Sequence, residues 1–228
     1  MQKELKLLAS LAQKKNKEDA FGKKLMEEKV YMEAVKGNME YFFGKNEQNQ
    51  DSTRSTTIGS DSHDNDSKFQ SQIAPDGSNV LHLAIQHKHV EFAKKVMECY
   101  PHLIWEKDYN GDTPLHTAAK LWCLKDSGLH DSYFKARWEE ACGRYLANPS
   151  EEGLLIIPPW RVKNCQGNTP LHEVMKSARE LMDFGECLLS FDLEVITYAN
   201  GAGDTPLHLC EQQINLERQS KQCISLNN

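Results

Sequence analysis

The chain has 228 residues, 39% of them hydrophobic and 26% charged, which is enough for one large soluble domain or two small ones. A mean hydropathy of -0.64 and the lack of a long apolar run exclude a membrane-spanning helix from this sequence. The net charge of -6 makes nucleic acid an unfavourable partner, because binding to phosphates needs a basic face. The first thirty residues contain no apolar segment typical of a secretory signal, so we expect a cytoplasmic location.

The seven cysteines are scattered along the chain, and no two of them form a Cys-x-x-Cys pair. Disulfide frameworks and zinc sites both favour close pairs, so we predict free thiols and no bound metal or other cofactor. The sequence also lacks a Gly-x-Ser-x-Gly elbow, a P-loop and a His-Glu-x-x-His motif. We therefore predict no catalytic residues and no enzymatic activity. A Cys/His nucleophile is the less favoured alternative.

The first predicted region comprises residues 1–43. Leu5, Leu8 and Leu11 share one face of a helix that is otherwise rich in lysine. Residues 30–42 (VYMEAVKGNMEYF) then have the spacing of two short helices joined at a Gly-Asn step. We expect both parts to cap one end of a larger helical array. For the first helix, binding to a membrane surface or to a calmodulin-type partner is the alternative.

The second region, residues 44–73, is rich in serine, threonine and aspartate and poor in apolar residues. Such a composition cannot bury enough apolar surface to become ordered, so we predict a disordered linker. Its acidic stretch at 60–67 (SDSHDNDS) places serines among carboxylates. This pattern fits acidophilic kinase sites, and a plain solvated linker is the other interpretation.

An internal repeat dominates the third region, residues 74–228. Its four copies are 76–82 (DGSNVLH), 110–116 (NGDTPLH), 166–172 (QGNTPLH) and 202–208 (AGDTPLH), with glycines 34, 56 and 36 residues apart. The glycine supplies the positive φ of a tight turn. Threonine can cap the free amides of a following helix, and proline suits its first position. We therefore predict helices that start at Pro114, Pro170 and Pro206, each directly after a turn.

The repeated unit resembles the ankyrin repeat, which has a period of about 33 residues and the signature T-P-L-H-x-A. This resemblance implies an all-α fold, namely an ankyrin-repeat solenoid of stacked helix pairs with hairpin-like loops. In such a fold the recurring histidine serves repeat geometry through hydrogen bonds that close the turn. A metal cluster of His82, His87 and His89 is the minor alternative. The structural signature residues are Gly77, Leu81, His82, Gly111, Thr113, Pro114, Leu115, His116, Gly167, Thr169, Pro170, Leu171, His172, Gly203, Thr205, Pro206, Leu207 and His208.

Two features depart from a regular period. The 56-residue interval after the second copy exceeds the 34-residue interval before it, so we expect an insertion within residues 124–160. Its aromatic and proline residues either anchor a partner or pack within a lengthened helix pair over residues 131–147. The fourth copy is followed only by a short polar tail. We expect an incomplete final repeat in a truncated or alternative product of a longer protein.

Three segments resemble one particular group of ankyrin proteins. Residues 31–38 (YMEAVKGN), 79–85 (NVLHLAI) and 101–108 (PHLIWEKD) are similar to the plant ankyrin proteins of the accelerated-cell-death type. In that family residues 30–42 would be a degenerate capping repeat. Its members usually continue into a membrane domain with several helices, the PGG domain, which this sequence lacks, and they act in defence and stress signalling. The resemblance implies the cytoplasmic face of the plasma membrane as the alternative location.

We predict that the protein is a non-enzymatic protein-protein interaction module, because a repeat array offers an extended concave surface to other proteins. The sequence does not identify the partner, and a full-length membrane relative is one possibility. A soluble truncated competitor of that relative is the alternative function. The candidate partner-binding residues lie at the turn tips, where we expect their side chains to project outward: Tyr109, Asp112, Lys163, Asn168, Asn200 and Asp204.

Overall fold

The computed structural model describes residues 24–44, 72–122, 140, 157–176 and 182–226. This part of the chain is mostly helical, as an all-α protein requires, and carries one short parallel strand pair, β1 (Lys24–Leu25) with β2 (Gln72–Ile73). The helix predicted around Leu5, most of the predicted linker and the helix pair predicted in the insertion fall outside the described residues. Among the helices that are described, none is long and apolar enough to cross a membrane.

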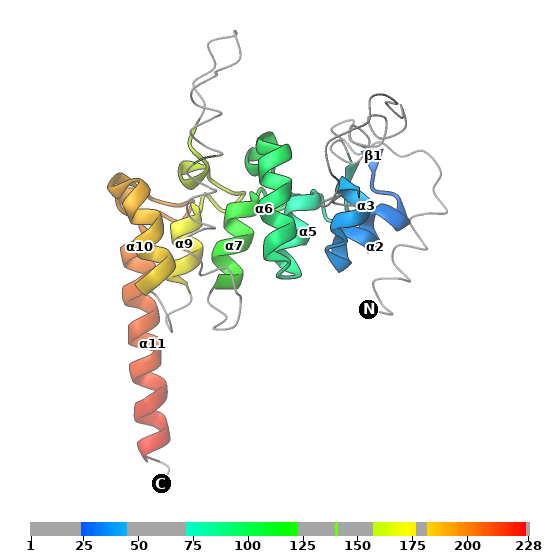
Figure 1. The fold of residues 1–228 in the computed structure, drawn as a ribbon. Coiled ribbons are helices and arrows are strands. Elements are labelled where there is room, and N and C mark those ends of the chain that lie inside the picture. Colours follow the sequence, from blue (N-terminus) through cyan, green and yellow to red (C-terminus); the bar gives the residue numbers. More distant parts are fainter. Residues whose placement is uncertain (1–23, 45–71, 123–139, 141–156, 177–181, 227–228) are drawn as a thin grey trace, which may run out of the picture.

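Several of the described helices follow one another in pairs along the chain (Figure 1). The elements are α2 (Glu28–Lys36), α3 (Met39–Phe43), α5 (Val80–Gln86), α6 (Val90–Cys99), η1 (Pro101–Trp105), α7 (Pro114–Trp122), η2 (Pro159–Arg161), α9 (Pro170–Met175), α10 (Met182–Phe191), η3 (Leu193–Thr197) and α11 (Pro206–Leu226). The helix starts predicted at Pro114, Pro170 and Pro206 are confirmed.

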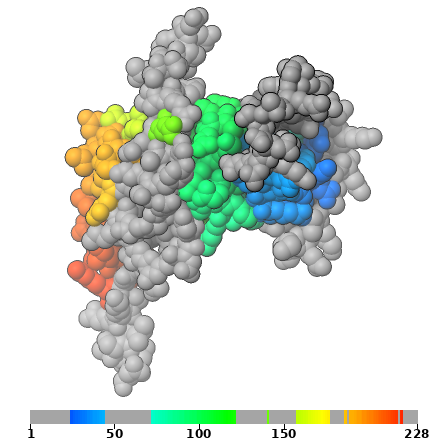
Figure 2. All heavy atoms as spheres, viewed as in Figure 1, coloured from blue at the N-terminus to red at the C-terminus, as the bar shows by residue number. Residues whose placement is uncertain are grey.

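Helices α2, α5, α7, α9 and α11 form a row in which each packs on the next. In the space-filling view the coloured segments follow one another across the visible face in sequence order (Figure 2). Leu81, Leu115 and Leu171 are at most 1% exposed, and each such burial contributes roughly 1.5–3 kcal/mol. Ala84 and Ala118 are fully buried where neighbouring helices approach. The buried residues of successive helices belong to one cluster, so the core continues along the row.

An aromatic cluster joins the first helix pair to the second. Phe42 lies 5.0 Å from Phe92 between ring centroids, and Phe43 lies 6.0 Å from Phe92 and 6.4 Å from Tyr100. Such aromatic pairs add roughly 0.5–1.5 kcal/mol each beyond the area they bury. The first helix pair, predicted from residues 30–42, is therefore packed against the rest of the stack.

One expectation at a segment end is wrong. Gln72 and Ile73, assigned by composition to the disordered linker, are buried in β2. They pair with β1, and the Gln72 side chain accepts a hydrogen bond from the Glu27 amide at 3.1 Å. The partner lies 45 residues away, so local composition could not indicate it. After the fourth repeat copy the chain continues as a single helix, because α11 runs on to Leu226.

Candidate protein-interaction surface

Four turns of identical backbone design precede the helices α5, α7, α9 and α11. We call them the first to fourth turns, and together the turn ridge; they comprise residues 74–78, 108–112, 164–168 and 200–204. In each turn the N–H of the first residue donates to the C=O of the fifth, at 2.7, 2.9, 2.9 and 2.8 Å respectively. The fourth residue is always a glycine with positive φ, between 75° and 86°. The same local sequence pattern therefore produces the same turn four times.

The side chain of the first turn residue explains why aspartate or asparagine recurs there. The Asp108 Oδ1 atom accepts hydrogen bonds from the amides of Asn110 and Asp112, both at 2.8 Å. Asn164 and Asn200 accept the corresponding bonds in the third and fourth turns. Such side-chain bonds to the following backbone stabilise a turn locally.

Adjacent turns are also bonded to each other. In every case the N–H of the second residue donates to the C=O of the third residue in the preceding turn. The bonds are Tyr109 to Asp76 at 3.1 Å, Cys165 to Asn110 at 3.0 Å and Gly201 to Gln166 at 2.9 Å. The turn ridge is therefore continuous across all four turns.

The signature histidines connect one repeat to the next. The His116 Nδ1 atom accepts from the Thr113 amide at 3.2 Å, which leaves the proton on Nε2. Nε2 then donates to the Asn168 carbonyl at 2.9 Å. His82 and His172 make the equivalent bonds to the carbonyls of Asp112 and Asp204, at 3.0 and 3.1 Å. These buried rings hold the fifth residue of the following turn in place.

The expectation that all six tip residues project outward is wrong for Asp112 and Asn168, which are 2% and 1% exposed. Asp112 accepts from the Asn164 amide group at 2.9 Å and pairs with Lys120. Asn168 accepts from Asn200 in the same way, at 2.9 Å. In the second and third turns the fifth residue thus points beneath the ridge, where it bonds the first residue of the next turn.

The environment of Asp112 keeps its carboxyl group ionised. Burial alone raises the pKa of this group, but the hydrogen bonds from Lys120 and Asn164 outweigh burial, so the pKa lies below its ordinary value. A buried carboxylate is stable only when it is paired in this way. Asp112 therefore belongs to the structural interior of the repeats.

Among the remaining tip candidates, two are plainly exposed. Tyr109 is 47% exposed, and its ring lies so close to Gly77 that a Cβ there would come within 2.7 Å of the Tyr109 Cδ1 atom. Lys163 is exposed and lies over the Tyr198 ring, 5.9 Å from the centroid. Asn200 and Asp204 are only half-buried. A partner-binding role for these four residues remains a prediction.

Sequence reasoning missed a second lysine on the turn ridge. Lys107 donates to the Lys163 carbonyl at 2.8 Å, and Lys163 donates to the Ala199 carbonyl at 2.6 Å. Both lysines precede their turn glycine by four positions, so alignment of the repeat copies could have found them. They give the exposed side of the ridge a cationic edge beside Tyr109.

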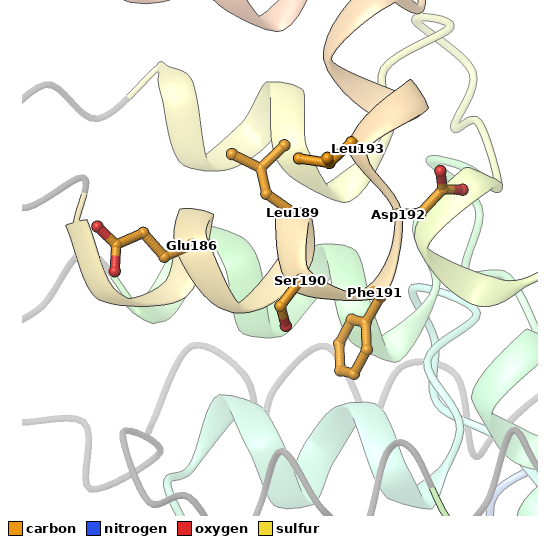
Figure 3. A pocket seen from close by; sticks show the side chains of 6 residues that line it. All are labelled: Glu186, Leu189, Ser190, Phe191, Asp192 and Leu193. Carbon is orange, nitrogen blue, oxygen red and sulfur yellow. The ribbon is translucent and has the colours of Figure 1, made fainter.

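A shallow hollow of about 560 Å³ lies where α10 meets η3. Figure 3 shows the side chains of Leu189 and Leu193 converging there, with Asp192 pointing away from them. Asp192 pairs with Arg161 and accepts from the Trp160 indole at 3.3 Å, and the bond to Arg161 lowers the pKa of the carboxyl. The hollow thus offers apolar contact. Within the described ranges, no group of three or more His, Cys, Asp or Glu residues is placed to hold a metal.

The buried histidines predict that the protein loses stability in mild acid. Burial lowers the pKa of His116 from 6.5 to about 4 and also lowers the pKa of His82 and His172. The unfolded chain binds a proton at the higher pKa, so the contribution of His116 is complete above pH 6.5 and disappears as the pH falls towards 4. We expect the free energy of unfolding to fall by about 3 kcal/mol from this residue alone.

Urea denaturation at a series of pH values between 7.5 and 4.5 measures this effect directly. His116→Gln removes the titrating ring, so its free energy of unfolding should depend less steeply on pH than that of the unchanged protein. An unfolding midpoint that stays constant from pH 7 to 4.5 would contradict the prediction.

Comparison with known proteins gives one distant similarity. No protein-family model matches the chain. The chain is 26% identical over 132 residues, 58% of its length, to the protein ACCELERATED CELL DEATH 6 of Arabidopsis thaliana. The match spans 18% of that relative, so the chain covers less than a fifth of it. The chain is therefore distantly similar to part of a plant cell-death protein.

Proposed function

We propose that the protein is a non-enzymatic protein-interaction module of the ankyrin-repeat type that acts in plant defence or stress signalling. The observation that carries this proposal is the periodic bonding of the turn ridge, in which each turn is joined to the next by the same backbone contact. A ridge held in this way presents side chains from successive repeats at fixed spacing, as repeat proteins do when they bind other proteins. The similarity to ACCELERATED CELL DEATH 6 supports the defence role.

The exposed side of the turn ridge provides the contact surface in this proposal. Tyr109 supplies a large, half-exposed aromatic ring, and Lys107 and Lys163 supply charge beside it. Tyrosine is enriched among residues that dominate the binding energy of protein interfaces. The partner therefore contacts Tyr109 and Lys163 together.

The competitor function is a second candidate, favoured by one observation. Leu207 in α11 is 60% exposed, although its repeat equivalents are fully covered. An uncovered repeat end suits a chain that occupies the repeats of a longer relative. The Cys/His enzyme alternative has less support, because the Nδ1 atom of each signature histidine accepts from the backbone amide three residues before it.

Affinity capture from plant tissue tests the interaction module. We expect Tyr109→Ala combined with Lys163→Ala to reduce capture of the specific partners by at least about tenfold, since an aromatic anchor is lost. Tyr41→Ala combined with Lys36→Ala is the matched control, because it removes an exposed tyrosine and lysine from the first helix pair, away from the turn ridge.

Both double variants should keep the unfolding midpoint of the unchanged protein, so that a loss of capture reports the surface and not the fold. Equal capture by the unchanged protein and by the Tyr109 and Lys163 variant would refute the proposed contact surface.

A further inference from the structure

Two kinds of hydrogen bond recur wherever one turn meets the next, and a third occurs where the third and fourth turns meet the turn before them. The backbone N–H of the second turn residue donates to the preceding turn, as Cys165 does to Asn110. The signature histidine donates forward to the fifth residue of the following turn, as His116 does to Asn168. An asparagine at the first position donates its side-chain amide backward, as Asn164 does to Asp112. These bonds define the chemistry of one repeat face binding another.

The fourth turn presents the same groups without a following turn, and Asp204 Oδ1 accepts from the Gln212 side-chain amide at 3.3 Å. The carbonyl of Ala202, the carboxylate of Asp204 and the Nε2 atom of His208 occupy the equivalent positions, and among the described residues no fifth turn meets them. The His208 ring is exposed, whereas His116 is completely buried. The end of the stack therefore has the donor and the acceptors that the internal junctions use.

The space around this end also matches an internal junction from which the next turn is missing. At Gly111 an added Cβ would lie 2.7 Å from the Cys165 amide nitrogen, because the next turn passes directly over the glycine. At Gly203 the same position has no atom within 4 Å. A groove of about 350 Å³ opens there between the turn and α11, lined by residues that include Asp204 and His208. Leu207 is 60% exposed, against 1% for Leu115.

We propose that this end, formed by the fourth turn and the start of α11, binds a repeat hairpin of the Asn-x-x-Gly-x-Thr-Pro-Leu-His type carried by another protein. The hairpin would donate a backbone amide to Ala202 and an asparagine side chain to Asp204, and its fifth-residue carbonyl would accept from His208. Its backbone would pass over Gly203 and its helix would cover Leu207. The proposal rests on the interaction-module function and assigns that function a second surface.

A second copy of this chain does not meet the same requirements. Its leading turn has Ala74 at the first position, which has no side-chain amide to donate. That edge is already occupied, since β1 pairs with β2 and the Met26 amide donates to the Ile73 carbonyl at 2.7 Å. A leading repeat with an uncovered asparagine turn meets these requirements better than a second copy does.

The test uses the 228-residue chain and a recombinant stack of three consensus repeats that carry this hairpin sequence and lack an N-terminal cap. Biolayer interferometry measures their association. We expect Leu207→Glu to weaken binding at least about tenfold, because it places a charge in the covered position. Leu216→Glu is the matched control, since Leu216 is 58% exposed on the same helix but nine residues away, on the opposite face.

A further variant reports the close approach of backbones. Gly203→Ala adds a Cβ that touches nothing in the free chain but meets the incoming turn, so it should also weaken association. Replacing the leading asparagine of the probe by alanine should likewise weaken association. Because the φ of Gly203 is 86°, Gly203→Ala also strains its own turn, and the unfolding midpoint of this variant is measured beside its binding.

Three results would overturn the proposal. They are no association of the unchanged chain with the probe at about 100 μM, equal binding by the Leu207→Glu and Leu216→Glu variants, and self-association of the chain that Leu207→Glu abolishes. The Tyr109 and Lys163 double variant should still bind the probe. If the probe does not bind, capture of partners by the turn ridge is still expected. The two experiments therefore distinguish a failure of this proposal from a failure of the proposed function.

Discussion

Replacing Gly111 by valine is expected to lower the free energy of unfolding by more than about 3 kcal/mol. The φ of Gly111 is 75°, a conformation that a β-branched residue adopts only at a cost. The new Cβ would also lie 2.7 Å from the Cys165 amide nitrogen and 2.9 Å from its sulfur. The third turn must then move away, which breaks the bond from Cys165 to the Asn110 carbonyl. Urea denaturation followed by circular dichroism measures the loss.

Gly203→Val separates the two causes of this loss. The φ of Gly203 is 86°, so the backbone strain is similar, but an added Cβ has no atom within 4 Å. We expect this variant to cost only about 1–3 kcal/mol, the strain of one residue. The difference between the variants measures the contact between turns. Equal losses would mean that the turns do not support one another.

His116→Ala is expected to cost about 3–5 kcal/mol. The substitution leaves the Thr113 amide without its acceptor and the Asn168 carbonyl without its donor, both in buried surroundings. It also leaves a cavity where the fully buried ring was. The same denaturation experiment gives the value, and the loss should be seen at pH 7.5, where the ring is neutral.

His208→Ala is the matched control for this second prediction. His208 holds the same position in the last repeat, but its ring is exposed and accepts only from the Thr205 amide at 3.2 Å. We expect a cost of less than about 1 kcal/mol, as for most surface substitutions. If His116→Ala proves equally mild, the signature histidine acts only within its own turn and the repeat-to-repeat bond contributes little.

The local elements of this protein could be predicted because their causes are local. A proline that begins a helix needs only a fixed φ and an amide without a partner, and both are properties of the residue itself. The tight turn before it likewise depends on a glycine that reaches positive φ. Helix starts at Pro114, Pro170 and Pro206 follow from these causes.

The candidate surface could be predicted only in part. Tyr109 and Lys163 are exposed, but Asp112 and Asn168 are buried although they belong to the same turns. All four residues were predicted at turn tips, but Asp112 and Asn168 are fifth turn residues, whereas Tyr109 is a second residue and Lys163 precedes its turn. What distinguishes them is the neighbouring turn, whose asparagine bonds the fifth residue and draws it beneath the ridge. The pairing of Gln72 with β1 escaped prediction for the same reason.

By itself the sequence determined the repeated unit of this protein: the turn, its glycine, the helix start and the position of the histidine. Each depends on the conformational preferences of a few adjacent residues. Only the tertiary structure decided which identical groups are buried and which are exposed, as the contrast between Leu115 and Leu207 demonstrates. Burial and hydrogen bonding between repeats depend on whether a neighbour is present, because a repeat covers its apolar face only by stacking.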